Sequence, residues 1–236
     1  MTLAERVAEL DWYHTLALGD GVETVGMFDI RPFVRRFGLP DDMTGVRALD
    51  VGTWDGFWAF EMERRGADVT ALDLDDEREL DIPPRRRPQS FPDTPRGAGF
   101  AIAKQALGSS VRRVARNVYD ARPKELGQFD LVFCGSVIIH LRDQFLALER
   151  IAGLVNPGGI FISAEAYDPK LDLLPFAASR YLADRDKAVV FWMQARRTWK
   201  RMLWSVGFDD VREHDRFKLK ATAGWNVPHV VHHARR

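Results

Sequence analysis

The sequence is poor in cysteine, has no excess of either charge and contains no long apolar run. Its single cysteine, Cys134, excludes an internal disulfide and a thiolate-rich metal site. Lys plus Arg number 34 and Asp plus Glu number 34, whereas a dedicated nucleic-acid-binding protein usually carries a basic excess. No stretch of about 18 apolar residues is present, so no membrane span is predicted. Because the N-terminus is acidic and amphipathic rather than signal-like, we expect a soluble, cytoplasmic protein.

What the sequence does contain is an alternation of apolar strands and helices. It has 236 residues, 46% of them hydrophobic, which is enough for one sizeable domain with a core. Strands are expected at 47–51, 69–74, 111–118, 129–139 and 160–166, and helices at 57–65, 100–107 and 143–154. This alternation indicates an α/β protein with a mainly parallel sheet covered on both faces. The segments GFDDVREHDRFKL and WNVPHVVHHA have no clear helix between them, which predicts an antiparallel hairpin at one edge.

Three segments lie outside this alternation. Residues 1–44 form an extension, with a short helix at 3–10 and then a stretch rich in glycine and aromatic residues. Residues 75–98 contain five prolines and are expected to form a long loop. Residues 170–206 are expected to be mostly helical.

The turn after the first core strand has the pattern D-x-G-x-x-x-G. Gly52 permits a tight turn, and Gly56 lets the next helix begin close to the strand. Trp54 stands where dinucleotide-binding turns carry a glycine that lets the backbone approach a pyrophosphate, so NAD and FAD fit less well. No Lys-Ser/Thr pair follows, which excludes a phosphate-binding P-loop. A ligand without phosphates fits better, with an ammonium group held by Asp50.

An acidic residue closes the second core strand. Asp73 stands at the position where a carboxylate accepts hydrogen bonds from both ribose hydroxyls. Strand, glycine turn and acidic strand end together predict an adenosine-type ligand with a zwitterionic tail, which is S-adenosylmethionine (SAM).

Several motifs resemble those of class I SAM-dependent methyltransferases over roughly residues 45–236. They are ALDVGTWDG, VTALDLD, FDLVFCGSVIIHL, NPGGIFISAEA and MLWSVGFDDV, in that order and spacing. The resemblance implies a Rossmann-like fold with a seven-stranded, mostly parallel sheet and an antiparallel last strand. It also implies a SAM-binding domain at 45–236, an acceptor-site insert at 167–206 and an N-terminal lid at 1–44.

A narrower resemblance covers the extension. WYHTLALGDGVETVGMFDIRP followed by the glycine turn is similar to proteins grouped with tRNA wobble-uridine carboxymethyltransferases, which use carboxy-SAM. Those enzymes place a carboxylate-binding tyrosine before a histidine, whereas here Ile139 precedes His140 and cannot donate a hydrogen bond. Their upstream cofactor-contacting lysine corresponds approximately to Arg31. We therefore expect ordinary SAM and methyl transfer.

The resemblance also implies a set of cofactor contacts. The loop after the third strand meets adenine, Leu74 covers one adenine face, and the end of the fourth strand lies under the reactive end of the cofactor. Alternatively, Asn117 caps its own loop and Cys134 is a small buried residue. The expected cofactor-binding residues are Arg31, Asp50, Gly52, Thr53, Trp54, Gly56, Asp73, Leu74, Asn117, Val118, Tyr119, Cys134 and Ser136.

His140 is the candidate catalytic residue, because imidazole can accept a proton near neutral pH. The alternative is a structural histidine at the start of a helix. The expected acceptor-binding residues are Trp12, Tyr13, His14, Phe28 and Tyr167; the alternative for the aromatic residues of the extension is hydrophobic docking of its helix. His232 and His233 point to opposite faces of a strand, so no metal site is predicted.

The sequence thus predicts a SAM-dependent methyltransferase acting on an oxygen or nitrogen of a small molecule. A second hypothesis is an RNA-modifying methyl- or carboxymethyltransferase that uses the basic runs at 85–87, 112–116 and 196–201. A third is a non-catalytic or atypical SAM-binding protein. The sequence predicts no oligomeric state.

Overall fold

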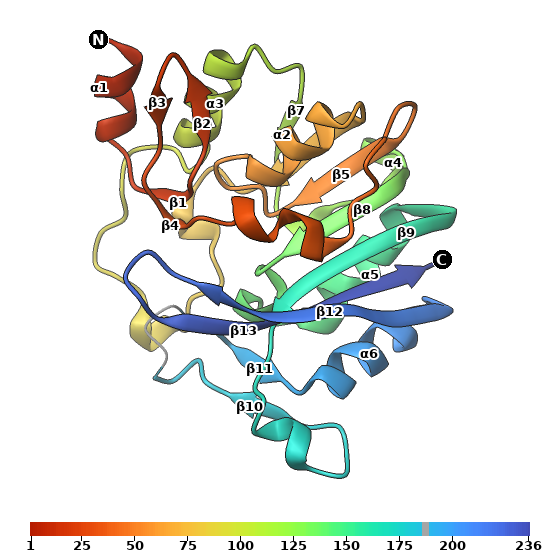
Figure 1. Cartoon of the computed structure of the whole chain (residues 1–236). Helices are drawn as coiled ribbons and strands as arrows, with labels where there is room; N and C mark the ends of the chain where they lie inside the picture. Colours follow the sequence, from red (N-terminus) through yellow and green to blue (C-terminus); the bar gives the residue numbers. More distant parts are fainter. Residues whose placement is uncertain (186–188) are drawn as a thin grey trace.

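A seven-stranded sheet forms the centre of the computed structural model, which describes residues 1–185 and 189–236 (Figure 1). Its strands are β5 (Arg47–Val51), β6 (Asp68–Asp73), β7 (Arg112–Ala115), β8 (Phe129–Gly135), β9 (Val155–Ala166), β12 (Asp210–Lys220) and β13 (Asn226–Arg235). Their order is β12-β13-β9-β8-β5-β6-β7. β13 is antiparallel to both of its neighbours, and the other pairs are parallel. The predicted mostly parallel sheet with an antiparallel last strand is confirmed.

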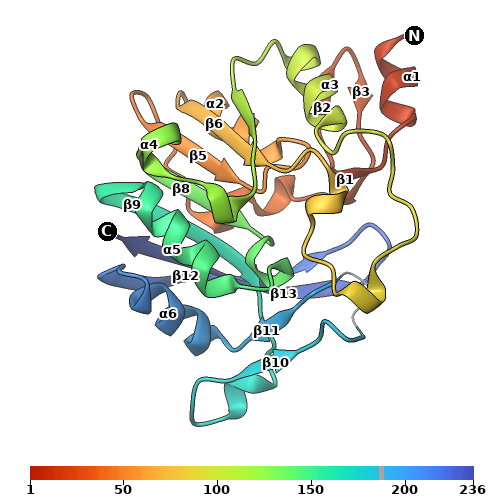
Figure 2. The ribbon, with the colours of Figure 1, turned by 180° about the vertical axis from the view of Figure 1, so that it is seen from behind.

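Each face of the sheet carries its own hydrophobic cluster. Alternate residues of β8 point to opposite faces, so Phe133 belongs to one cluster and Val132 to the other. The first cluster includes α1 (Leu3–Ala8), α2 (Phe57–Arg64), α3 (Ala98–Leu107) and the 3-10 helix η1 (Arg31–Phe37). The second includes α4 (Pro123–Leu126), α5 (Gln144–Leu154) and α6 (Arg196–Ser205), which lie in front of the sheet in Figure 2.

Side chains that cap the backbone set two of the element boundaries. Asp143 accepts a hydrogen bond from the Leu146 amide at 3.0 Å and begins α5. Asn117 accepts one from the Tyr119 amide at 3.0 Å and begins the 3-10 helix η4 (Val118–Asp120). For this reason β7 ends at Ala115, three residues before the predicted end of this strand.

The N-terminal extension is built from short strands joined to the main domain. They are β1 (Trp12–His14), β2 (Ala17–Gly19), β3 (Val22–Glu23) and β4 (Gly26–Phe28). β1 pairs with β4, and β4 in turn meets the β12–β13 hairpin through an isolated bridge from Phe28 to Ala221. Phe28, Ile30 and Phe37 are buried in the first core cluster, so the extension shares the core of the main domain.

The prediction that residues 170–206 are mostly helical is wrong. In the described part of this range, the 3-10 helix η6 (Leu171–Leu173) is followed by β10 (Ser179–Tyr181), β11 (Trp192–Gln194) and α6. β10 and β11 pair antiparallel, and Tyr181 packs on Trp192 across them with ring centroids 5.0 Å apart. Cross-strand aromatic contacts of this kind favour a hairpin over a helix.

The proline-rich loop at 75–98 is ordered by two short 3-10 helices. These are η2 (Glu77–Glu79) and η3 (Pro84–Arg86). The Arg86 guanidinium donates to the carbonyl of Ala183 at 2.9 Å, which joins this loop to the segment after β10. The loop therefore follows one defined path across the carboxyl end of the sheet.

Candidate functional site

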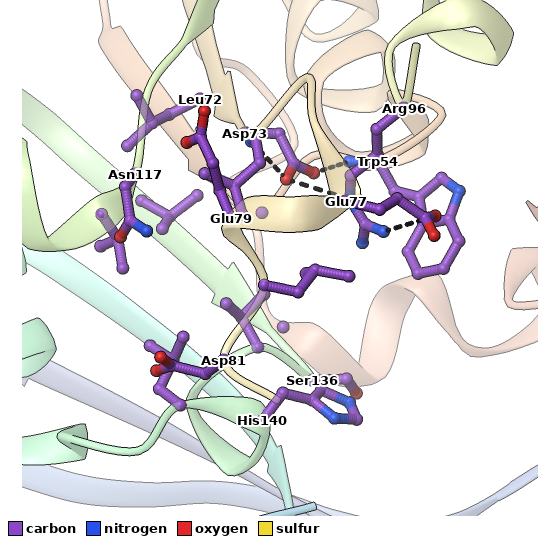
Figure 3. A pocket seen from close by; sticks show the side chains of 18 of the residues that line it. Trp54, Leu72, Asp73, Glu77, Glu79, Asp81, Arg96, Asn117, Ser136 and His140 are labelled. Carbon is purple, nitrogen blue, oxygen red and sulfur yellow. Dashed lines mark hydrogen bonds and ion pairs between the residues drawn. The ribbon is translucent and has the colours of Figure 1, made fainter. Parts of the chain in front are cut away.

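A cavity of about 290 Å³ opens at the carboxyl ends of β5, β6 and β8. Residues at or directly after the ends of these strands line it, among them Gly52, Asp73 and Ser136. The strand order reverses between β5 and β8, and in open α/β sheets this is where ligands bind. Figure 3 shows Asn117, the Trp54–Arg96 contact, and the end of β8 with Ser136 on three different parts of the wall.

The glycine turn has the close packing that its sequence predicts. Gly52 has a φ of +75°, and a Cβ atom there would lie 2.2 Å from a methyl carbon of Val137. A Cβ on Gly56, whose φ is +94°, would lie 2.4 Å from the Phe60 ring and 2.7 Å from the Phe100 ring, so the start of α2 packs closely against these rings only because this position is glycine. Trp54 adopts a φ of +47°, a conformation that is uncommon for a residue with a side chain.

Contacts on three sides hold Trp54 in this conformation. Its amide donates to Asp73 Oδ2 at 2.7 Å. Its ring stacks on Tyr13 with centroids 5.0 Å apart, and the Arg96 guanidinium lies 3.9 Å from its centroid. The turn, the extension and the proline-rich loop therefore meet at one tryptophan. Figure 3 shows Arg96 reaching from the loop toward Trp54, Asp73 and Glu77.

Asp73 presents its carboxylate at the cavity wall. Oδ1 accepts from the Leu74 amide at 2.7 Å and lies 3.4 Å from Arg96 Nε. The backbone amides fix the carboxylate in one orientation, and Oδ2, which accepts only from the Trp54 amide among the described residues, keeps a lone pair for a ligand hydroxyl. The side chain fits the ribose role that the sequence predicts.

Asp50 is a buried carboxyl group with an unsatisfied oxygen. It lines the cavity, and its Oδ2 atom has no hydrogen-bond partner among the described residues. Burial raises the pKa of Asp50 to about 7. A cationic group brought into the cavity would offset the cost of burying the ionised carboxylate, so the site fits the ammonium group of an amino-acid tail. Thr53 beside it does not line the cavity, and its buried hydroxyl partly offsets the rise in the Asp50 pKa.

The adenine end predicted around η4 lies on the cavity wall. Asn117, Val118 and Tyr119 all line the cavity, as does Leu74. The Asn117 side chain also caps its own loop, so its amide nitrogen is the part left for a ligand. The Tyr119 hydroxyl donates to Asp81 Oδ2 at 2.5 Å and is thereby committed to the proline-rich loop.

The proline-rich loop contributes cavity residues that the sequence analysis missed. They are Glu77, Glu79, Leu80, Asp81, Ile82 and Arg96. Asp81 Oδ2 also accepts from the Arg142 amide at 2.8 Å, which holds the loop against the start of α5. The run of acidic residues directly after Asp73 was the available signal in the sequence.

The end of β8 carries a strained serine. Ser136 has a φ of +56°, and its Oγ lies 2.8 Å from His229 Nε2. Because His229 Nδ1 donates to the carbonyl of Val227 at 3.0 Å, Nε2 is the acceptor and the Ser136 hydroxyl donates to it. Burial lowers the pKa of His229 to about 4, so the ring is neutral near pH 7. The sequence analysis missed His229, whose partner is 93 residues away.

A smaller chamber of about 20 Å³ adjoins this end of the cavity. Tyr13, His14, Trp58, Gly135 and Ser136 border both spaces. The chamber is otherwise mostly apolar, with walls from the extension, β9 and the β12–β13 hairpin. It has room for about one water molecule or one small functional group of a ligand.

A buried pair joins the extension to the glycine turn. His14 Nδ1 lies 2.5 Å from Asp55 Oδ1, and both side chains are buried. Asp55 Oδ2 accepts from the amides of Tyr13 and His14 at 3.0 and 2.7 Å. The sequence analysis missed Asp55, which lies in the turn but points away from the strand toward β1.

Some predicted site residues do not line the cavity. Arg31 is paired with Asp29 and Glu23 on the surface. The Trp12 indole donates to the carbonyl of Val7 at 2.9 Å, which matches the alternative of helix docking. Four other predicted residues also do not line the cavity: Gly56, Cys134, Phe28 and Tyr167. Gly56 precedes α2, and burial raises the pKa of the Cys134 thiol. Phe28 packs on Tyr13, and the Tyr167 ring lies beneath the Arg196 guanidinium.

His140 ends the 3-10 helix η5 (Ile138–His140) and lines the cavity beside Ser136 (Figure 3). In β13, next to the edge strand β12, His232 is buried. His233 is half-buried and bonded to the Phe37 carbonyl, and the two neighbouring side chains point to opposite faces. No group of three or more potential metal ligands occurs within residues 1–185 and 189–236. In the same ranges no helix is long and apolar enough to cross a bilayer.

The family of the chain follows from a match over most of its length. A family model described as a methyltransferase domain matches residues 28–213. The chain belongs to this methyltransferase family. As the glycine turn and Asp73 predicted, the chain is a SAM-dependent methyltransferase.

Two curated relatives are ubiquinone biosynthesis O-methyltransferases. The one from Marinobacter nauticus is 24% identical over 202 residues, which cover 84% of this chain and 75% of that protein. The one from Xanthomonas oryzae is 30% identical over 146 residues, 60% of this chain and 52% of its own length. The methyltransferase thus aligns with only about half the length of some curated relatives.

Two solved structures have the same fold. The N-terminal domain of EvdMO1, with S-adenosylhomocysteine (SAH) bound, aligns with a TM-score of 0.64 at 17% identity and covers 99% of this chain and 95% of that one. A 1,6-didemethyltoxoflavin-N1-methyltransferase from Burkholderia thailandensis aligns with a TM-score of 0.55 at 20% identity, over 88% and 77% of the two chains. At these identities the likeness concerns the fold.

Proposed function

We propose that the methyltransferase transfers the methyl group of SAM to a hydroxyl oxygen of a small molecule. The observation that carries the proposal is the convergence of Asp50, Asp73 and the glycine turn on one cavity that continues into a narrow chamber. The curated relatives named above, which are O-methyltransferases, support an oxygen acceptor.

The residues of the cavity fit SAM in their chemistry. We propose that Asp73 accepts from the ribose hydroxyls and that Asp50 pairs with the ammonium group. Leu74, Asn117 and Val118 would then surround the adenine. When bound, SAM supplies a methyl group on a positively charged sulfur, which is already an excellent leaving group. The protein therefore has mainly to align the acceptor and to exclude water.

Two covers can exclude water from the site. The extension contributes Tyr13 and His14, and the proline-rich loop contributes Arg96, which closes over Trp54. We propose that residues 1–44 act as a lid and that the acceptor is bound between this lid and the segment at 167–206, with His140 in contact with it. From the described part of that segment Val189 lines the cavity.

An RNA acceptor is the second candidate, and the arrangement of the basic runs favours it less. Arg113 is paired with Asp75 at 2.6 Å, and Arg116 with Glu125. Arg196 is paired with an aspartate and a glutamate at 2.6 and 2.7 Å. Cations neutralised within the protein contribute less to phosphate binding. A carboxymethyl transfer is disfavoured too, because Ile139 is apolar and Arg31 is paired elsewhere.

The test combines binding with turnover. Calorimetry with SAH should give tight binding, and SAH formation from SAM should depend on an added catechol, a probe for hydroxyl acceptors. Faster turnover on bulk tRNA than on catechol would favour the RNA function. Binding of SAH without turnover on either probe would favour the non-catalytic hypothesis. An affinity for carboxy-SAM tenfold above that for SAM would favour carboxymethyl transfer.

A further inference from the structure

His14 has an orientation that the lid role does not require. Its ring packs on Phe57 with centroids 5.4 Å apart, and Tyr13 meets it edge-on at 4.7 Å. Its Nδ1 atom is bonded to Asp55, whose carboxylate is itself fixed by two backbone amides. The ring therefore has one orientation, set by contacts on several sides.

The contact with Asp55 also fixes the tautomer of His14. A carboxylate oxygen only accepts hydrogen bonds, so Nδ1 carries the proton that is donated to Asp55. In the neutral ring Nε2 then has a free lone pair, and no group in the described part of the chain is hydrogen-bonded to it. Histidine held by a carboxylate in this way is suited to accept a proton, as in the Asp–His pairs of hydrolases.

His14 is also in the right place for such a role. It borders both the main cavity and the chamber, together with Ser136 at the end of β8. Because Asp55 occupies the Nδ1 edge of the ring, Nε2 is the nitrogen available to a ligand in these spaces. The charged or titratable groups facing the ring are Asp55 from the turn, Asp50 from β5 and Tyr13 from β1.

We propose that His14, oriented by Asp55, is the general base of the methyl transfer. This inference rests on the proposed hydroxyl acceptor. The acceptor hydroxyl gives its proton to His14 Nε2 while its oxygen forms a bond to the methyl carbon. The carbon–sulfur bond breaks, its electron pair goes to sulfur, and the positive charge formerly on sulfur is now on the imidazolium next to Asp55. Asp55 is a positioning residue.

The kinetic test uses two acceptor probes of different acidity, catechol and the more acidic 4-nitrocatechol. His14→Gln should lower kcat on catechol by about 100-fold or more, and by a clearly smaller factor on 4-nitrocatechol, which needs less help to lose its proton. Asp55→Asn should show the same pattern, because the amide can also donate and disturbs the tautomer. SAH affinity should stay within threefold in both variants, and His214→Gln, an exposed histidine outside both cavities, should behave as wild type.

Two kinetic results would overturn the proposal. One is a loss of kcat in His14→Gln that is equal on both probes, which would indicate that His14 has only a structural role. The other is an acidity-dependent loss in His140→Gln rather than in His14→Gln, which would move the base to His140.

A measurement without turnover separates this proposal from the proposed function. In nitrogen-15 NMR of histidine-labelled protein with SAH, the His14 signal, identified by its absence in His14→Gln, should show a protonated Nδ1 and an unprotonated Nε2. A protonated Nε2 in the neutral ring overturns the base assignment, whatever the acceptor. If wild type methylates neither probe but the Nδ1 proton is found, the hydroxyl acceptor fails while the orientation by Asp55 holds.

Discussion

Asp50 is the residue whose protonation state a bound cofactor would change most directly. Its carboxyl group is buried with one oxygen unsatisfied, and burial raises its pKa to about 7. Near neutral pH a large part of the apo protein therefore has Asp50 protonated and uncharged. An ammonium group binds better to the ionised form, so binding and deprotonation are linked.

SAH affinity should therefore increase as the pH rises from 6 to 8. A group with a pKa of about 7 changes from mostly protonated to mostly ionised in this window, so the gain can reach about tenfold. Calorimetry in two buffers with different ionisation enthalpies should detect protons released on binding. Asp50→Asn should bind more weakly at pH 8, with a nearly flat pH profile. Parallel profiles in the variant and wild type would assign the linkage to another group.

Asp73 is expected to matter at every pH. Asp73→Ala removes the acceptors proposed for the ribose hydroxyls, a loss of about 1.5–3 kcal/mol, or roughly 10- to 150-fold in SAH affinity. Asp73→Asn keeps an oxygen that can accept from the Trp54 amide, so this variant controls for collapse of the turn. Unchanged SAH affinity in both variants would remove Asp73 from the site.

The sequence predicted those site residues that lie in one local pattern. Asp50, Gly52 and Asp73 follow from strand ends and spacing, and all three line the cavity. Asp55 and His229 were missed because each works through a partner distant in sequence, 41 and 93 residues away. No local pattern shows that such side chains meet, because the meeting depends on how the extension and the last hairpin pack.

At the scale of elements, the alternation of apolar strands and helices predicted the core of the sheet correctly. The structure of the exposed segments could not be predicted in this way. The range 170–206 was misread because its charged and apolar residues also suit a helix, whereas pairing between β10 and β11 decides the structure. The loop at 75–98 was placed from its prolines, but its position over the cavity depends on contacts with Tyr119 and α5 that the composition does not reveal.

Asp81 should hold the proline-rich loop closed. Asp81→Ala removes the acceptor for the Tyr119 hydroxyl and the Arg142 amide. We expect faster hydrogen exchange over residues 76–96 and a several-fold weaker SAH affinity, with little change in melting temperature because no core residue is altered. Asp93→Ala, an exposed acid on the same loop, is the matched control. Unchanged exchange in Asp81→Ala would show that the other contacts of the loop are sufficient to hold it.

At the scale of the whole molecule, the order of the core elements was predictable and the place of the extension was not. The sheet follows from strands that alternate with helices, which right-handed crossovers then arrange. The extension has no such rule, and its residues Phe28, Ile30 and Phe37 enter the same cluster as α2. The buried Trp12 matches the alternative of helix docking, whereas Tyr13 and His14 border the cavity, which is the position that the proposed lid requires.

The fold also buries two histidines and two carboxyl groups, and their ionisation links its stability to pH. Burial lowers the pKa values of His229 and His232 to about 4, so their burial costs stability as the pH falls through 6.5 toward 4. Burial raises the pKa values of Asp50 and Glu165 to about 7 and 8. The unfolded chain ionises these acids near pH 4, so their burial costs stability as the pH rises toward 8. Between about pH 4.5 and 6.5 the two pairs act in opposite directions.

Above pH 6.5 the effect of the acids should dominate, because the unfolded histidines lose their remaining protons within about one pH unit, whereas Asp50 and Glu165 resist ionisation in the folded protein up to pH 7 to 8. The free energy of unfolding of the apo protein should fall by about 1–2 kcal/mol between pH 6.5 and 8. Urea denaturation at a series of pH values measures this. Saturating SAH should remove the contribution of Asp50 to this fall, because the ammonium group pairs with the ionised carboxylate. The variant Glu165→Gln keeps the shape of the side chain without its charge and should remove most of the remaining fall. A free energy of unfolding that rises across this window would mean that both acids are ionised in the folded apo protein, and that an unidentified cation or buried water already satisfies them.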